Sequence, residues 1–198
     1  MKRLDILVAG VGGQGTILAS DILAEVGMLA GYDVKKSDVL GLAVRGGSVL
    51  SHVRWGEKVA SPVISPGMAN FLLGFEPLEA LRVIPYLSLE STVLVNTRVV
   101  PPVSVSSGNM DYPSLDAIER ALRAACRKFF SFDATAVAEK LGTARVANLV
   151  MLGAFSTQVE VPFEIWEDVI LARVPAKYRD LNLRAFHAGR ELLKGGLQ

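Results

Sequence analysis

A glycine-rich turn directly behind a short apolar run is the feature that most constrains how this chain can fold. Residues 4–9 (LDILVA) predict a buried strand, and residues 14–30 predict a helix. The glycines between them match the spacing of the dinucleotide-binding fingerprint, in which glycine allows a tight turn and a close backbone approach. The unpaired amides at the start of such a helix attract an anion. The candidate ligand-binding residues of the turn are Gly10, Gly12, Gly13, Gln14, Gly15 and Thr16.

Composition narrows the class of protein. The 198 residues are 51% hydrophobic, and 21 basic against 20 acidic residues give a formal net charge of +1. A nucleic-acid-binding surface is not expected, because phosphate recognition needs clustered Lys and Arg. No apolar run approaches the roughly 20 residues of a membrane span, so no membrane association is expected. The single cysteine rules out an internal disulfide framework and predicts a reducing, cytoplasmic location.

Strand-like and helix-like runs alternate along the chain, which predicts one domain over residues 1–198. The expected fold is α/β, a Rossmann-like three-layer sandwich with a largely parallel sheet and a helical C-terminal part. Two strand-like runs at 49–55 and 59–64 are too close for a helical crossover and predict an antiparallel hairpin. The other expected strands are 32–36, 71–75, 91–96 and 129–132, and the other expected helices are 76–84, 114–127, 133–141, 144–157, 162–172 and 176–193.

Three further positions are candidate ligand-binding sites. Arg45, Gly46, Gly47 and Ser48 place a planar cation beside bare backbone, which suits a carboxylate or phosphate, although a solvated surface turn is the alternative. Glu76 and Asn96 each follow a strand, where the crevice of an α/β sheet lies. Helix capping by Glu76 and turn formation by Asn96 are the alternatives.

The sequence within and after the glycine turn argues against a nicotinamide-binding site. The acidic residue expected about 20 positions further on is replaced by Lys35 and Lys36, and Gly13 adds a glycine inside the motif. A purely structural turn, and an anion from another ligand or a partner chain, remain open. No catalytic residue and no metal site are predicted. One cysteine and two histidines cannot hold an iron–sulfur cluster or a histidine-rich metal site, and no GxSxG or P-loop pattern is present.

Several separated motifs together resemble one family. The segments GVGGQG, VRGGSVLSHVRWG, FLLGFEPLEALR, VLVNT, ANLVMLGAF and NLRAFHAG are similar to the gamma-type domain of 2-oxoacid:ferredoxin oxidoreductases. The segment RGGSVLSHVR most resembles the small (beta) subunits of indolepyruvate:ferredoxin oxidoreductases, which are stand-alone chains of this type. The resemblance covers nearly the whole chain.

The resemblance implies an accessory subunit of a complex that converts a 2-oxoacid to an acyl-CoA and reduces ferredoxin. Thiamine diphosphate and the iron–sulfur clusters are then expected on a larger catalytic subunit, with coenzyme A as a candidate ligand of this chain and ferredoxin as an indirect partner. A homodimer of the isolated chain stays open.

The substrate that the resemblance implies is an aryl pyruvate. Leu40 and Val44 stand near positions where aryl-pyruvate members usually carry histidine and glutamine, so pyruvate, 2-oxoglutarate and a branched-chain oxoacid are alternatives. The competing functions are a stand-alone NAD(P)-binding dehydrogenase and a non-catalytic interaction module.

Overall fold

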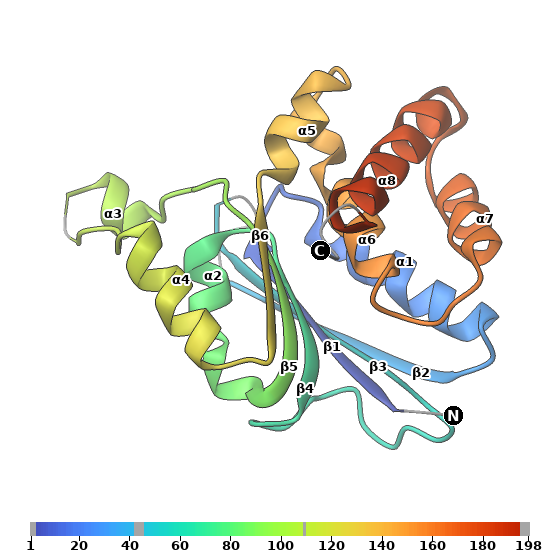
Figure 1. Cartoon of the computed structure of the whole chain (residues 1–198), viewed down its shortest axis with the longest axis horizontal. Helices are drawn as coiled ribbons and strands as arrows, with labels where there is room; N and C mark the ends of the chain where they lie inside the picture. Colours follow the sequence, from blue (N-terminus) through green and yellow to red (C-terminus); the bar gives the residue numbers. More distant parts are fainter. Residues whose placement is uncertain (1–2, 42–45, 109, 195–198) are drawn as a thin grey trace.

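A six-stranded sheet lies between two layers of helices in the computed structural model, which describes residues 3–41, 46–108 and 110–194 (Figure 1). The strand order is β2-β3-β1-β4-β5-β6. The strands are β1 (Leu4–Val11), β2 (Asp33–Leu40), β3 (Ser48–Gly56), β4 (Ala69–Gly74), β5 (Leu87–Asn96) and β6 (Lys128–Phe132). The α-helices are α1 (Thr16–Leu29), α2 (Pro77–Arg82), α3 (Val103–Ser106), α4 (Leu115–Ala124), α5 (Ala134–Lys140), α6 (Ala147–Ser156), α7 (Phe163–Arg173) and α8 (Arg179–Lys194), and short 3₁₀ turns lie at Ile84–Tyr86, Ala144–Val146 and Ala176–Tyr178.

The sheet is mixed, and β3 is the one strand of the six that runs against the others. β1 pairs in parallel with β4, β4 with β5 and β5 with β6, whereas β3 pairs antiparallel with both β1 and β2. The predicted α/β, Rossmann-like sandwich with a largely parallel sheet, an antiparallel hairpin and a helical C-terminal part is therefore confirmed.

The chain reverses its direction of travel across the sheet between β1 and β4. After β1 it crosses through α1 to β2 on one side, and from β4 it proceeds through α2 and α4 to β6 on the other. Figure 1 shows α1 and α5–α8 on one face and α2 and α4 on the opposite face, and each face has its own apolar core. The carboxyl ends of β1 and β4 thus form a topological switch point, which is where open α/β sheets bind ligands.

The predicted hairpin between 49–55 and 59–64 is wrong in its second strand. Residues 59–64 form an irregular loop, and β3 instead makes its hairpin with β2. β3 is already paired along both edges, by β1 and β2, so it has no free edge for a further strand. The spacing argument identified an antiparallel neighbour correctly but assigned it to the wrong segment.

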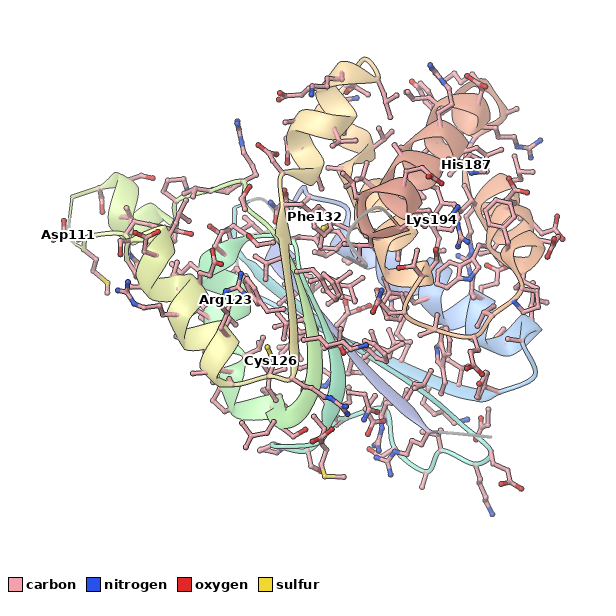
Figure 2. All side chains as sticks on the ribbon, viewed as in Figure 1. Asp111, Arg123, Cys126, Phe132, His187 and Lys194 are labelled. Carbon is pink, nitrogen blue, oxygen red and sulfur yellow. The ribbon has the colours of Figure 1, made fainter. Side chains whose placement is uncertain are left out.

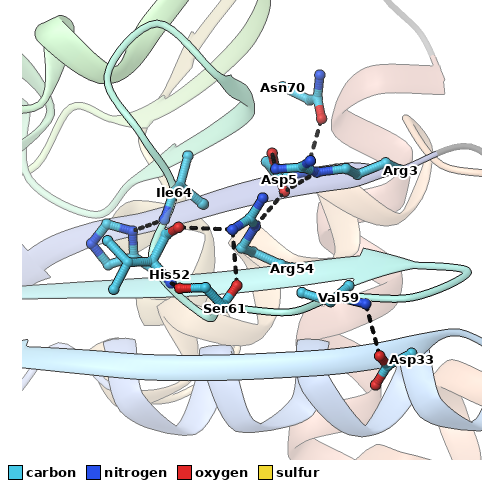
Figure 3. A network of polar contacts seen from close by, with 10 residues as sticks. Arg3, Asp5, Asp33, His52, Arg54, Val59, Ser61, Ile64 and Asn70 are labelled. Atoms are coloured by element: carbon cyan, nitrogen blue, oxygen red, sulfur yellow. Dashed lines mark hydrogen bonds and ion pairs between the residues drawn. The ribbon is translucent and has the colours of Figure 1, made fainter.

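In this loop, hydrogen bonds from side chains of the strands take the place of the backbone pairing that a further strand would have (Figure 3). Arg54 donates to the carbonyl oxygens of Ser61 and Val63, each at 2.8 Å, and to the buried Asp5 carboxylate at 2.8 Å. Asp33 accepts from the amide of Val59 at 2.8 Å. Buried backbone groups need partners, and here charged side chains supply them.

The C-terminal helices pack closely on the α1 face. A side chain on Gly153 of α6 or Gly189 of α8 would overlap the backbone of the facing helix, so glycine at both positions sets how closely these helices cross.

In the described part of the chain, no helix is long and apolar enough to cross a membrane.

Candidate functional site

The glycine turn lies at the carboxyl end of β1, as the sequence predicted. Gly15 has a φ of 78°, in the left-handed region, and forms the N-cap of α1. Gln14 closes the turn, because its Oε1 accepts from the Val11 amide at 2.8 Å and its Nε2 donates to the Phe75 carbonyl at 3.0 Å. A Cβ on Gly10 would lie within 3 Å of Thr16, Gln14 and Phe75, so glycine is required there for packing.

The start of α1 is arranged to receive an anion. No side chain caps this 14-residue helix and no acidic residue lies in its first turn. Its first amides therefore keep their partial positive charge for an external group. A pocket of about 350 Å³ lies here, lined by Gly12, Gly13, Gly15, Thr16, Ile17 and Leu40 among others; it is called the glycine-loop pocket below.

The second predicted motif lies beside the first. The amide of Gly12 donates to the Gly47 carbonyl at 2.8 Å, and the amide of Gly46 donates to the Gly12 carbonyl at 3.2 Å. Ser48 donates its hydroxyl to the Glu79 carboxylate at 2.5 Å. Arg45 lies outside the described residues. The structure thus brings Gly46–Ser48 and the glycine turn together, and their role in binding stays a prediction.

A second pocket, which also has Gly13 in its lining, lies at the switch point. It has a volume of about 220 Å³ and contains Gln14, Asn96, Thr135 and Met151, with Arg98 and Arg145; it is called the switch-point pocket below. Asn96, 3% exposed, donates from Nδ2 to the Phe75 carbonyl at 3.2 Å and to Thr135 Oγ1 at 3.0 Å. Its Oδ1 is buried with no partner among the described residues. Asn96 is therefore placed where the sequence expected it, and its ligand-binding role stays a prediction.

Both carboxylate oxygens of Glu76 accept hydrogen bonds that stabilise the fold. Oε2 accepts from the Glu79 amide at 2.9 Å and so caps α2. Oε1 accepts from the Tyr112 hydroxyl at 2.6 Å and from the Val100 amide at 3.3 Å. Burial raises the pKa of Tyr112, and the hydrogen bond to the Glu76 carboxylate raises it further. Glu76 ties α2 to the 97–113 segment, as the capping alternative expected, and any contact of Glu76 with a ligand remains a prediction.

Sequence reasoning missed Arg98, Thr135 and Arg145. Arg98 could have been found, because it comes two residues after Asn96 beyond the end of β5. Thr135 and Arg145 come from the later helical part, and only the packing of α5 and the 3₁₀ turn Ala144–Val146 over the sheet places them there. No local sequence signal carries that information.

The remaining reactive residue types serve other purposes. His52 is buried, its Nδ1 accepts from the Ile64 amide at 3.2 Å, and burial lowers its pKa. Cys126 lies between α4 and β6, near the start of β6 and far from Phe132 at the other end of that strand (Figure 2). Burial raises the pKa of its thiol. Among the described residues, no group of three or more His, Cys, Asp or Glu side chains could hold a metal ion.

These features define an α/β domain of the doubly wound class, with two pockets beside a glycine turn at the carboxyl ends of its strands. The chain belongs to the pyruvate ferredoxin/flavodoxin oxidoreductase family, whose model matches residues 5–192. The predicted resemblance is therefore confirmed.

Relatives match along almost their full length. Indolepyruvate oxidoreductase subunit IorB of Thermococcus kodakarensis is 40% identical over 197 residues, which covers 98% of each chain. The 2-oxoglutarate synthase subunit KorC of Methanothermobacter thermautotrophicus is 31% identical over 203 residues, covering 98% of this chain and 97% of that subunit.

Solved structures agree on the fold. The gamma subunit of a keto/oxoacid ferredoxin oxidoreductase from Geobacter sulfurreducens superposes with a TM-score of 0.68 at 26% identity, covering 95% of this chain and 96% of that one. A 2-oxoglutarate:ferredoxin oxidoreductase from Magnetococcus marinus, with 2-oxoglutarate, coenzyme A and succinyl-CoA bound, gives a TM-score of 0.73 at 19% identity. This chain matches 32% of that longer chain with 98% of its own length, a likeness of fold alone.

Proposed function

We propose that this chain is the small accessory subunit of a cytoplasmic 2-oxoacid:ferredoxin oxidoreductase, folded as a single gamma-type domain. The observation that carries the proposal is the 40% identity to an indolepyruvate oxidoreductase subunit across 98% of both chains. A match over the full length of a separate subunit favours the same role here. This identity favours an aryl pyruvate as the substrate over 2-oxoglutarate, because the indolepyruvate oxidoreductase subunit is 40% identical and the 2-oxoglutarate synthase subunit is 31% identical.

The partner in this proposal is a larger subunit that carries thiamine diphosphate and the iron–sulfur clusters. Clusters of this kind are held by about four thiolates, and this chain has one cysteine. The carbon–carbon bond cleavage and the electron transfer to ferredoxin are therefore assigned to the partner.

Coenzyme A is the ligand proposed for the glycine-loop pocket. The uncapped amides of α1 and the bare backbone of Gly12 and Gly13 fit a phosphate group, and Ile17 and Leu40 offer apolar contact. When bound, coenzyme A supplies the thiol that accepts the acyl group. The role of this chain is to hold and orient the coenzyme at its phosphates.

A charge placed at Ile17 tests this site. Ile17 is 39% exposed in the first turn of α1 and lines the pocket. An Ile17→Glu variant keeps the helix stable, because a carboxylate is favourable at a helix N-terminus, but it competes with a phosphate for the same amides. We expect coenzyme A binding to weaken by about tenfold, about 1.4 kcal/mol, in a calorimetric titration.

The matched control is Ile17→Gln, which removes the same apolar side chain without adding charge. It should bind coenzyme A more tightly than Ile17→Glu does. Equal affinities in the two variants would place the phosphates elsewhere.

Association with a catalytic subunit tests the function itself. The chain is co-expressed with a thiamine-dependent 2-oxoacid oxidoreductase subunit from the same genome, and one of the two carries an affinity tag. A stable complex in fixed stoichiometry, measured by light scattering after purification, is the expected result. Two subunits that elute separately, or oxidation of a 2-oxoacid by this chain alone, would contradict the proposal.

A further inference from the structure

The outer edge of β6 is an unpaired edge of the sheet. β6 is the last strand in the order β2-β3-β1-β4-β5-β6, so no strand pairs with its outer side among the residues that the structure describes. Figure 1 shows β6 in the foreground, with α4 to its left and α8 to its upper right. A groove of about 410 Å³ lies along this strand, lined by residues 129–132 together with Glu119 and Arg123 of α4 and Leu192 and Leu193 of α8; it is called the β6 groove below.

The two edge strands of the sheet differ in how they discourage pairing with another chain. β2 carries four charged residues among its eight, and Lys36 forms ion pairs with Asp21 and Asp38. Charged side chains, lysine above all, protect an edge strand from association. β6 has the sequence KFFSF, with one charge and three aromatic rings among five residues. Aromatic residues favour strand pairing, so this edge lacks the protection that β2 has.

The hydrogen bonds of β6 show which backbone groups point to its outer edge. Asn96 pairs with Phe132 in the parallel ladder, and the amide of Thr97 donates to the Phe132 carbonyl at 3.1 Å. Alternate residues of a strand bond to the same neighbour, so Phe132 and Phe130 bond to β5. The amides and carbonyls of Phe129 and Ser131 therefore point away from β5, toward the β6 groove.

A second copy of the chain matches these outward groups. Phe129 and Ser131 lie symmetrically on either side of Phe130, so a two-fold axis beside Phe130 brings a second β6 alongside in the antiparallel direction. Phe129 of each copy then lies opposite Ser131 of the other. In such a pair the two residues exchange both of their backbone hydrogen bonds, so every outward group of Phe129 and Ser131 gains a partner.

Side chains and charges favour the antiparallel arrangement. Phe130 and Phe132 pack into the apolar core on the face of α5–α8, and the Phe130 rings of the two copies would meet on that face. Lys128 of one copy would lie opposite Phe132 of the other, which is a favourable cation–aromatic pair. A parallel arrangement would instead place the two Lys128 side chains next to each other, where like charges are destabilising.

We propose that the β6 groove is a self-association surface, through which two copies of this chain join their sheets edge to edge. The contact is one short strand and the sides of a groove, and Glu119 and Arg123 supply a polar rim of both charges. Such an interface belongs to the small and weak class, with an expected Kd of about 10–100 µM. It does not depend on the oxidoreductase role.

Sedimentation velocity of the isolated full-length chain, between about 1 and about 500 µM, tests this surface. Ser131→Pro removes the outward amide hydrogen, and proline is tolerated on an edge strand where the N–H faces away from the sheet. Ser131→Lys keeps the amide but adds a positive charge opposite Phe129 of the second copy, where the Arg123 guanidinium lies 4.6 Å from the centre of the Phe129 ring. Each variant should raise the Kd of the dimer by at least tenfold.

Met28→Lys is the matched control. It also replaces an exposed residue by lysine, since Met28 is 57% exposed, but it lies near the end of α1, on the side of the sheet that carries β2. A lysine near the end of a helix is favourable, so the variant should remain folded. Its Kd should equal that of the unchanged chain, which separates strand pairing from non-specific apolar association.

Amide hydrogen exchange measured by nuclear magnetic resonance tests the register. Raising the concentration from well below the Kd to well above it should slow exchange at Phe129 and Ser131 by about tenfold, because their amides become hydrogen-bonded across the interface. The amides of the β2 edge should exchange at the same rate at both concentrations. Protection along β2 and none along β6 would contradict the proposal.

A chain that stays monomeric up to about 500 µM, or a dimer with the same Kd in both Ser131 variants, would overturn the surface. Circular dichroism establishes that each variant is folded, and Ser131→Lys suffices if Ser131→Pro is not. If the unchanged chain is monomeric and Ser131→Lys no longer co-purifies with the catalytic subunit, the edge binds that subunit and not a second copy. A monomer that still assembles with the catalytic subunit leaves the accessory role intact, so the two proposals can fail separately.

Discussion

At the scale of single residues, Gly15 makes the turn possible. Its φ of 78° is unfavourable for any residue with a side chain, and a Cβ there would lie 2.6 Å from Asn148 Nδ2. Gly15→Ala should therefore destabilise the chain by about 1–2 kcal/mol from the backbone alone, with a further loss from the overlap. Urea unfolding followed by circular dichroism measures the change.

Gly67 provides the matched control. It has nearly the same conformation, with a φ of 73°, but an added Cβ meets nothing within 4 Å. Gly67→Ala should show only the backbone cost. Equal losses in the two variants would mean that Asn148 moves aside freely, and the close packing of the turn against α6 would then be unimportant.

Single residues also show how far sequence alone reaches. The turn glycines and Asn96 could be placed from the sequence because each lies at or just after the end of an apolar run that predicts a buried strand. The structural use of Glu76 could be anticipated only as an alternative, since Tyr112 and Val100 lie far from it in sequence. Arg145 had no signal, because its position depends on how the helical layer packs on the sheet.

At the scale of elements, a buried histidine is one of the side chains that hold the loop after β3, together with Arg54 and Asp33. His52 accepts a hydrogen bond from the Ile64 amide through Nδ1, which requires the neutral ring. Burial lowers the pKa of His52 below its usual 6.5, and the nearby Asp38 charge opposes the shift. A depressed folded-state pKa gives stability that is complete above the unfolded pKa and is lost as the pH falls.

The free energy of unfolding should therefore fall between pH 7 and pH 5, within the range where His52 becomes protonated in the unfolded chain at about 6.5. In His52→Asn the amide oxygen can replace Nδ1 as the acceptor and does not titrate, so the pH dependence should shrink. An unchanged pH dependence in the variant would contradict a role for His52.

Elements were predictable where their patterns were long and local. The first strand and helix, the later strands and the C-terminal helices all occur close to their expected ranges. The hairpin failed because residues 59–64 look like a strand but find no free edge, and Arg54 and His52 satisfy their backbone instead. Sheet pairing is a non-local property, and strand propensity alone does not determine it.

At the scale of the whole molecule, the reversal between β1 and β4 explains why two pockets share one glycine turn. The α1 face supplies helix amides to the glycine-loop pocket, and the C-terminal helices supply Thr135 and Arg145 to the switch-point pocket. The order of elements along the chain therefore determines which residues meet. The single-domain organisation and a homodimer of the isolated chain stay predictions.

Reconstituted activity tests the central claim most directly. A thiamine-dependent catalytic subunit is assayed for ferredoxin reduction with indolepyruvate, pyruvate, 2-oxoglutarate and a branched-chain oxoacid, with and without this chain. We predict that activity needs both subunits and coenzyme A, and that indolepyruvate gives the highest kcat/KM. Full activity of the catalytic subunit without this chain, or activity of this chain alone, would contradict the account.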